Sequence, residues 1–152
     1  MTRDNNIHIL MAGTNGDNKF WKAMGLLEEL SAKRITVTDR DSLFQALGKI
    51  PGPLMVLVLS SCLSEKLTRE EMLRIREVYK AEIIVAGKFS TWRDELNART
   101  AGIACYILLP DEAPALAEQA RHLLNTCRRR LDNQPGRLRG NNRTGLDVPF
   151  SS

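Results

Sequence analysis

Short continuous apolar runs alternate along this chain with longer segments in which apolar residues recur every three or four positions. The mainly apolar runs at 7–12, 54–59, 82–86 and 104–109 predict four strands, and the short β-branched segment at 34–38 predicts a fifth. The intervening segments predict helices over about 17–31, 39–50, 68–79, 91–101 and 111–127. A Pro-Gly-Pro stop at 51–53, a Thr68-x-x-Glu71 capping box and Gly102 as a helix C-cap mark three of the boundaries.

Five strands that alternate with five helices and are joined by short turns indicate an α/β domain built on a parallel sheet. Right-handed crossovers place helices on both faces of such a sheet. Ligands and reactions in these folds gather at the carboxyl ends of the strands. We expect residues 1–131 to form this domain and residues 132–152, rich in Gly, Asn, Pro and Arg, to be a flexible basic tail or linker.

The positive charge of the chain is concentrated at its C-terminal end. Residues 128–152 hold six Arg and two Asp, so they account for the whole formal charge of +4 and leave residues 1–127 neutral. The arginines can contact nucleic acid phosphates or anionic lipid. We favour a solvated tail or linker, because no aromatic residue interleaves them before Phe150 and no DNA-binding motif is present; the arginines concerned are Arg128, Arg129, Arg130, Arg137, Arg139 and Arg143.

Cysteine spacing and hydropathy predict a cytoplasmic protein. Cys62, Cys105 and Cys127 are odd in number and have neither metal-binding nor redox spacing, which fits a reducing compartment. Cys105 lies inside an apolar run and is expected to be a small core residue. No apolar run approaches the roughly 20 residues that cross a bilayer, and the polar start, residues 1–6, leads into no cleavage pattern.

Three local sequence patterns resemble those of CheY-like response-regulator receiver domains, over residues 7–127. Pro53 precedes an apolar strand, as it does before the receiver phosphorylation site. The stretch from Thr100 to Pro110 resembles the Ala-Gly-Ala…Tyr-(Leu/Ile)-x-Lys-Pro segment, and a Leu-rich last helix follows at Ala113. The resemblance implies a flavodoxin-like three-layer sandwich with a five-stranded parallel sheet in the order 2-1-3-4-5.

The resemblance also implies where phosphorylation chemistry would sit, and the required residue types are missing there. The positions of the two magnesium-binding acids fall on Ala12 and Gly13, and that of the acceptor Asp falls on Leu59 or Ser60. The position of the Thr or Ser falls on Ala86 or Gly87, and that of the Lys falls on Leu109. Magnesium requires oxygen ligands that normally include carboxylates, and an aspartyl phosphate requires a carboxylate nucleophile. We therefore predict a pseudo-receiver without metal, cofactor or enzymatic activity.

The family resemblance directs attention to one positive candidate, a protein-interaction face. In receivers the fourth helix, the fifth strand and the fifth helix form the usual dimer and output surface. Trp, Tyr and Arg are the residues that most often contribute binding energy at interfaces. The alternative is that Trp92 closes the core, as we expect for Trp21. The candidate face consists of Trp92, Arg93, Leu96, Arg99 and Tyr106.

Two loops are weaker candidates. The turn holding Gly13, Asn15, Gly16 and Asp17 can cradle an anion at a strand-to-helix junction. It matches neither the dinucleotide nor the P-loop motif, and plain turn chemistry explains the same residues. The loop Ser60-Ser61-Cys62 either carries a regulatory modification or simply caps the sheet edge; His8 and His122 are expected to be structural.

The predicted function is a non-enzymatic protein-interaction, dimerisation or localisation module in bacterial signalling. Similar atypical receivers begin larger proteins, such as pilus-assembly localisation ATPases of the TadZ type and transcription antiterminators of the AmiR type. Two alternatives stay open. One is a small-ligand or nucleotide-binding domain that uses the loop at 13–18, and the other is nucleic-acid binding through the arginine-rich tail.

Overall fold

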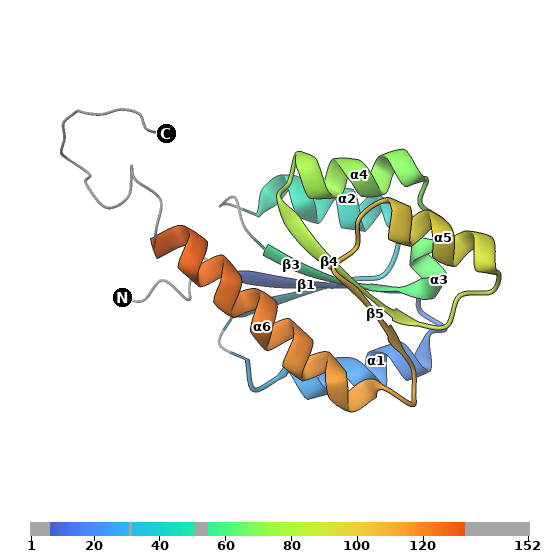
Figure 1. The fold of residues 1–152 in the computed structure, drawn as a ribbon, viewed down its shortest axis with the longest axis horizontal. Coiled ribbons are helices and arrows are strands. Elements are labelled where there is room, and N and C mark those ends of the chain that lie inside the picture. Colours follow the sequence, from blue (N-terminus) through green and yellow to red (C-terminus); the bar gives the residue numbers. More distant parts are fainter. Residues whose placement is uncertain (1–6, 31, 51–54, 133–152) are drawn as a thin grey trace.

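The computed structural model describes residues 7–30, 32–50 and 55–132. The five strands form one parallel sheet in the order β2-β1-β3-β4-β5, as predicted (Figure 1). Their bounds are β1 His8–Ala12, β2 Lys33–Val37, β3 Met55–Ser60, β4 Ala81–Gly87 and β5 Cys105–Leu108. The predicted Pro-Gly-Pro stop, Pro53 and Leu54, and the tail arginines Arg137, Arg139 and Arg143 lie outside the described residues.

Helices cover both faces of the sheet and complete the three layers (Figure 1). One face carries α1 (Asn18–Met24), the 3-10 turn η2 (Gly25–Leu27) and α6 (Ala113–Asp132). The other face carries α2 (Arg40–Lys49), α3 (Ser61–Ser64), α4 (Arg69–Glu77) and α5 (Trp92–Thr100). Together with the strand order, these layers confirm the predicted flavodoxin-like α/β architecture.

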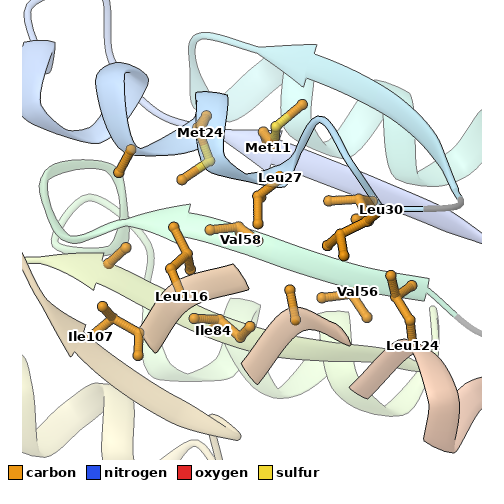
Figure 2. Packing of buried hydrophobic residues seen from close by; sticks show 14 of the residues in the cluster. Met11, Met24, Leu27, Leu30, Val56, Val58, Ile84, Ile107, Leu116 and Leu124 are labelled. Atoms are coloured by element: carbon orange, nitrogen blue, oxygen red, sulfur yellow. The ribbon is translucent and has the colours of Figure 1, made fainter. Parts of the chain in front are cut away.

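The strands alternate their side chains between two apolar layers, because successive residues of a strand point to opposite faces. Val56, Val58 and Ile84 face α1, η2 and α6, where Leu27 and Leu116 pack against them (Figure 2). The opposite layer is built from the alternate strand residues and from α2, α4 and α5; its members include Leu57, Ile83, Leu43, Met72 and Ile75. Burial on both faces explains why the central strands are continuous apolar runs.

Polar side chains fix the helix starts as the sequence indicates. The Thr68 capping box is complete, because Glu71 N donates to Thr68 Oγ1 (3.0 Å) and Thr68 N donates to Glu71 Oε1 (2.9 Å). Asp39 caps α2 by accepting from Ser42 N (2.7 Å), and this bond lowers the pKa of the Asp39 carboxyl. At the far end of α5, Gly102 adopts φ +87°, which favours glycine.

Several predicted boundaries were wrong, and Cys105, an expected core residue, packs at the edge of the core. The first helix ends at Met24 and tightens into a 3-10 turn at Gly25, a residue with weak helix propensity. The segment after β3, predicted as loop, forms the four-residue helix α3. The last helix begins at Ala113, two residues after the predicted cap Asp111. Cys105 is only partly buried, because β5 is an edge strand.

Candidate functional site

The carboxyl ends of the central strands meet where a receiver keeps its phosphorylation chemistry, and here they are lined by buried apolar groups. Strand register places Ala12 beside Leu59, and both are fully buried. On β4, Ala86 is also buried and pairs with Ser60. The Lys position is Leu109, whose backbone N–H donates to the carbonyl of Gly87 (3.0 Å). These positions present neither a carboxylate nor an ammonium group.

The hydroxyl of Ser60 is used within the fold. Ser60 is fully buried and its Oγ accepts from Leu63 N (3.0 Å), which makes it the N-cap of α3. Within residues 7–30, 32–50 and 55–132, no group of three or more His, Cys, Asp or Glu side chains is placed to hold a metal ion. Ser60 therefore has a structural role at the position where an acceptor carboxylate would stand.

Ser61 ties the first turn of α3 to the end of β4. Its Oγ accepts from Lys88 N (2.9 Å) and donates to Lys88 O (3.1 Å). Gly87 leaves room for this contact, because a Cβ at position 87 would lie 2.3 Å from Ser61 Oγ. Gly87 also has φ +143°, a conformation that side chains other than glycine rarely adopt.

Two further side chains hold the connection between β4 and α5, residues 87–91. Glu65 accepts from both the backbone N–H (2.6 Å) and the hydroxyl (3.1 Å) of Ser90. The hydroxyl of Tyr106 accepts from Phe89 N and donates to Gly87 O, each at 3.3 Å. Burial raises the pKa of the Tyr106 hydroxyl, so it stays protonated and able to donate. The connection is thus anchored from α3 and from β5.

Of the loop at 60–62, only Cys62 is exposed; Ser60 and Ser61 are buried. Partial burial raises the pKa of the Cys62 thiol, and the carboxylate of Asp17 raises it further. A raised pKa lowers the thiolate fraction and with it the reactivity of the sulfur. A modification of either serine hydroxyl would require the α3 turn to open first.

The candidate interaction face contains the most exposed large apolar side chain of the described residues. Trp92 is 69% exposed and Leu96, one helical turn later on α5, is 49% exposed. Arg93 lies over the Trp92 ring, with its guanidinium carbon 5.6 Å from the ring centre. The alternative in which Trp92 closes the core is wrong, because the indole points to solvent from the first turn of α5.

The other two residues of that face meet at its edge. Arg99 lies over the ring of Tyr106 at 5.6 Å, and its Nε donates to Glu95 (2.9 Å). Tyr106 is part-buried and anchored to residues 87–89, so it joins the face to the β4–α5 connection. Trp21, by contrast, packs edge-on against Phe20 at the rim of the core, as expected.

Two backbone donors of the turn at 13–17, those of Gly13 and Asp17, are engaged within the fold. Gly13 N donates to Val37 O and Asp17 N donates to Thr14 O, each at 3.2 Å. Trp21 Nε1 also donates to Thr14 O (2.7 Å), which holds the turn against α1. Gly13 is buried, and a Cβ there would lie 2.7 Å from the Phe20 ring; Asn15 and Gly16 are exposed. The backbone N–H groups of Gly13 and Asp17 are therefore used within the fold, and the anion-binding alternative for this turn stays a prediction.

The arginine cluster begins on the last turns of α6. Arg128 bonds to Asn125 (3.1 Å) and Arg129 to Thr126 (3.4 Å), each within the helix. Arg130 belongs to the same helix. Among the helices of the described ranges, none combines the length and apolar composition needed to cross a bilayer.

Strand order and helix placement define this chain as having the CheY-like receiver fold. It is similar to a two-component response regulator from Clostridium difficile, with 21% identity, TM-score 0.63, and 80% of this chain and 98% of that chain covered. The signal receiver domain of an HD domain-containing protein from Pseudomonas fluorescens gives 20% identity, TM-score 0.65, and coverage of 86% and 96%.

A putative pilus assembly-related protein from Burkholderia pseudomallei is similar as well, with 14% identity, TM-score 0.55, and coverage of 84% and 96%. No family model matches the sequence. No curated protein matches it either. The resemblance predicted from the local sequence patterns is therefore confirmed at the level of the fold.

Sequence reasoning missed the contact between Ser61 and Gly87. Its signal was present: a glycine closes the buried β4 run, and a serine pair closes the β3 run. Because β3 and β4 are neighbours, their carboxyl ends lie together. Without the strand register, nothing in the sequence says which serine bonds to which loop.

Proposed function

We propose that this chain is a pseudo-receiver, a cytoplasmic module of bacterial signalling whose output depends on protein association through α5 and not on aspartyl phosphorylation. The interaction face comprises Trp92, Arg93, Leu96, Arg99 and Tyr106. A second copy of the chain is the partner we test first.

The loss of phosphorylation chemistry supports the first half of the proposal. Phosphoryl transfer to a carboxylate requires the nucleophile and a metal that neutralises the phosphoryl oxygens. Leu59 and Ala12 are buried apolar residues at those positions, and Ser60 caps a helix. With Ser61 bonded to Lys88, the hydroxyl nearest the end of β4 is also engaged.

The observation that carries the second half is the exposure of Trp92. An indole that is 69% exposed beside a 49% exposed Leu96 leaves apolar area in water that association would remove. Trp and Arg are enriched among residues that dominate interface energetics. Hydrogen bonds from Phe89 N to Tyr106 and from Ser90 N to Glu65 anchor the connection that precedes α5, which supports a defined position for the face.

The test is light scattering over a concentration series, comparing the wild-type chain with Trp92→Ala. We expect a wild-type dimer and a variant whose dissociation constant is weaker by at least ten-fold, the usual scale for an interface hot spot. Leu26→Ala is the matched control, because Leu26 is 46% exposed on the opposite helical layer and should leave the association unchanged.

A wild-type monomer at every concentration, or a dimer that Trp92→Ala leaves intact, would contradict self-association through α5. A chain that gains a phosphoryl group from an acyl phosphate and magnesium would contradict the pseudo-receiver half.

A further inference from the structure

A groove lies between α1 and the connection from β5 to α6. Both helices lie on the face of the sheet away from α5 (Figure 1). Its volume is about 430 Å³ and its lining is mainly apolar. Ala23 and Leu109 form buried parts of the lining, while Leu26 stands 46% exposed at its side. Pro110 and Ala113 close the groove from the start of α6. We call this the α1 groove.

The rim of the α1 groove is positively charged. Lys19 and Lys22 lie three residues apart on α1, so both ammonium groups project from one side of the helix. Both side chains are exposed, and neither forms an ion pair with another residue of the described ranges. No acidic residue belongs to the lining. An apolar floor under two uncompensated cations is complementary to an amphiphile with an anionic head.

We propose that the α1 groove binds one monomeric amphiphile, an acyl chain that ends in a carboxylate. The acyl chain of the ligand lies on Ala23, Leu26 and Leu109, and its carboxylate forms ion pairs with Lys19 and Lys22. The volume falls within the range of roughly 300–1,000 Å³ typical of small-molecule sites. The exposed lysines alone would hold a small anion weakly, so most of the affinity comes from burial of the chain. This site is independent of the α5 face.

Calorimetric titration with octanoate, decanoate and dodecanoate, each kept below its critical micelle concentration, tests how affinity depends on the length of the acyl chain. Affinity should rise by up to about four-fold for each methylene buried, until the groove is full. Decanol, which lacks the charge, should bind about two- to five-fold more weakly than decanoate. Decyltrimethylammonium, which carries the opposite charge, should bind more weakly than decanol.

Three variants locate the site. Lys22→Gln should weaken decanoate about two- to five-fold, and Ala113→Leu, which extends a side chain into the groove, should weaken it more. Lys66→Gln is the control, because Lys66 is an exposed lysine near α3 on the other layer. Thermal melts show whether each variant is folded, and amide NMR shifts of the wild-type chain report the site even where a variant is not.

The result that supports the proposal is a chain-length-dependent affinity with amide shifts at Ala23, Leu26 and Ala113. Absence of binding by all three carboxylates overturns it. So does an affinity that Lys22→Gln and Ala113→Leu leave unchanged, or a set of shifts confined to Trp92 and Leu96. Loss of dimerisation in Trp92→Ala bears only on the α5 face, so the two proposals fail separately.

Discussion

The Oγ of Ser61 lies only 2.3 Å from the position that a Cβ at residue 87 would take, so with Ser61 in place only glycine fits at position 87. The contact joins the start of α3, which follows β3, to the end of β4. The strands β3 and β4 are neighbours in the sheet. It uses a serine hydroxyl to satisfy both backbone groups of Lys88.

Gly87→Ala should destabilise the chain strongly. The added methyl group would clash with Ser61, and the alanine residue would have to adopt the backbone angle φ +143°. We therefore expect a loss of about 2–4 kcal/mol in the free energy of unfolding. Urea denaturation measures it. Gly16→Ala is the matched control, since nothing lies within 4 Å of its Cβ position. If both variants unfold at the same urea concentration, the Ser61 contact is not a constraint.

Magnesium should leave the thermal midpoint unchanged, because a ligand stabilises only a protein that binds it. The strand ends offer buried Ala12 and Leu59 where carboxylate ligands would be needed. Differential scanning fluorimetry over a magnesium series, with calcium as a comparison, checks this. A midpoint that rises with magnesium and not with calcium would reveal a cation site.

The ion pair between Arg40 and Glu71 should make stability depend on pH. The hydrogen bond from Arg40 is the main cause that lowers the pKa of the Glu71 carboxyl below its value in the unfolded chain. The stabilisation is therefore present above the unfolded pKa and is lost as the pH falls through the folded pKa. We expect Arg40→Gln to destabilise the chain at pH 7 and to have much less effect at pH 3.

Urea denaturation of both proteins at the two pH values measures this difference. Arg69→Gln, a change in a neighbouring exposed arginine on α4, controls for the loss of net charge. An effect of Arg40→Gln that is equal at pH 7 and pH 3 would assign its role to packing against Phe44, over whose ring the guanidinium also lies.

Cys62 should react slowly with iodoacetamide despite its exposure. Partial burial is the first cause of its raised thiol pKa, and Asp17 adds to it. Asp17→Asn should therefore speed alkylation at pH 8 by a few-fold, because it increases the thiolate fraction. Mass spectrometry of the Cys62 peptide gives the rates, and Asp41→Asn serves as a distant control. A rate unaffected by Asp17→Asn would leave burial as the whole explanation.

The sequence predicted the sheet well because its signals are repeated and local. The runs at 82–86 and 104–109 could be placed as strands from apolar content alone, and the Thr68 capping box marked a helix start to the residue. The prediction failed at α3, because a four-residue helix has no period to detect and its cap Ser60 also fits a loop. Gly25 weakened α1 in a way that the surrounding apolar spacing concealed.

The candidate site was predictable in what it lacks and less so in what it contains. Missing carboxylates at positions 12 and 59 follow from alignment to a familiar pattern. Exposure of Trp92 did not follow, because an aromatic residue in a first helical turn packs inward or outward according to tertiary neighbours. The Ser61 contact depends on strand register and on the backbone angle of Gly87, which no local pattern encodes.

The pairing of Ser61 with Gly87 also makes positions 61 and 87 interdependent. A hydroxyl-bearing side chain at position 87 has no space while Ser61 is present. Replacing Ser61 in turn removes the hydrogen-bond partner of the Lys88 N–H and carbonyl groups. A change at either position alone therefore gives a less stable protein, so the two positions are expected to tolerate change only together.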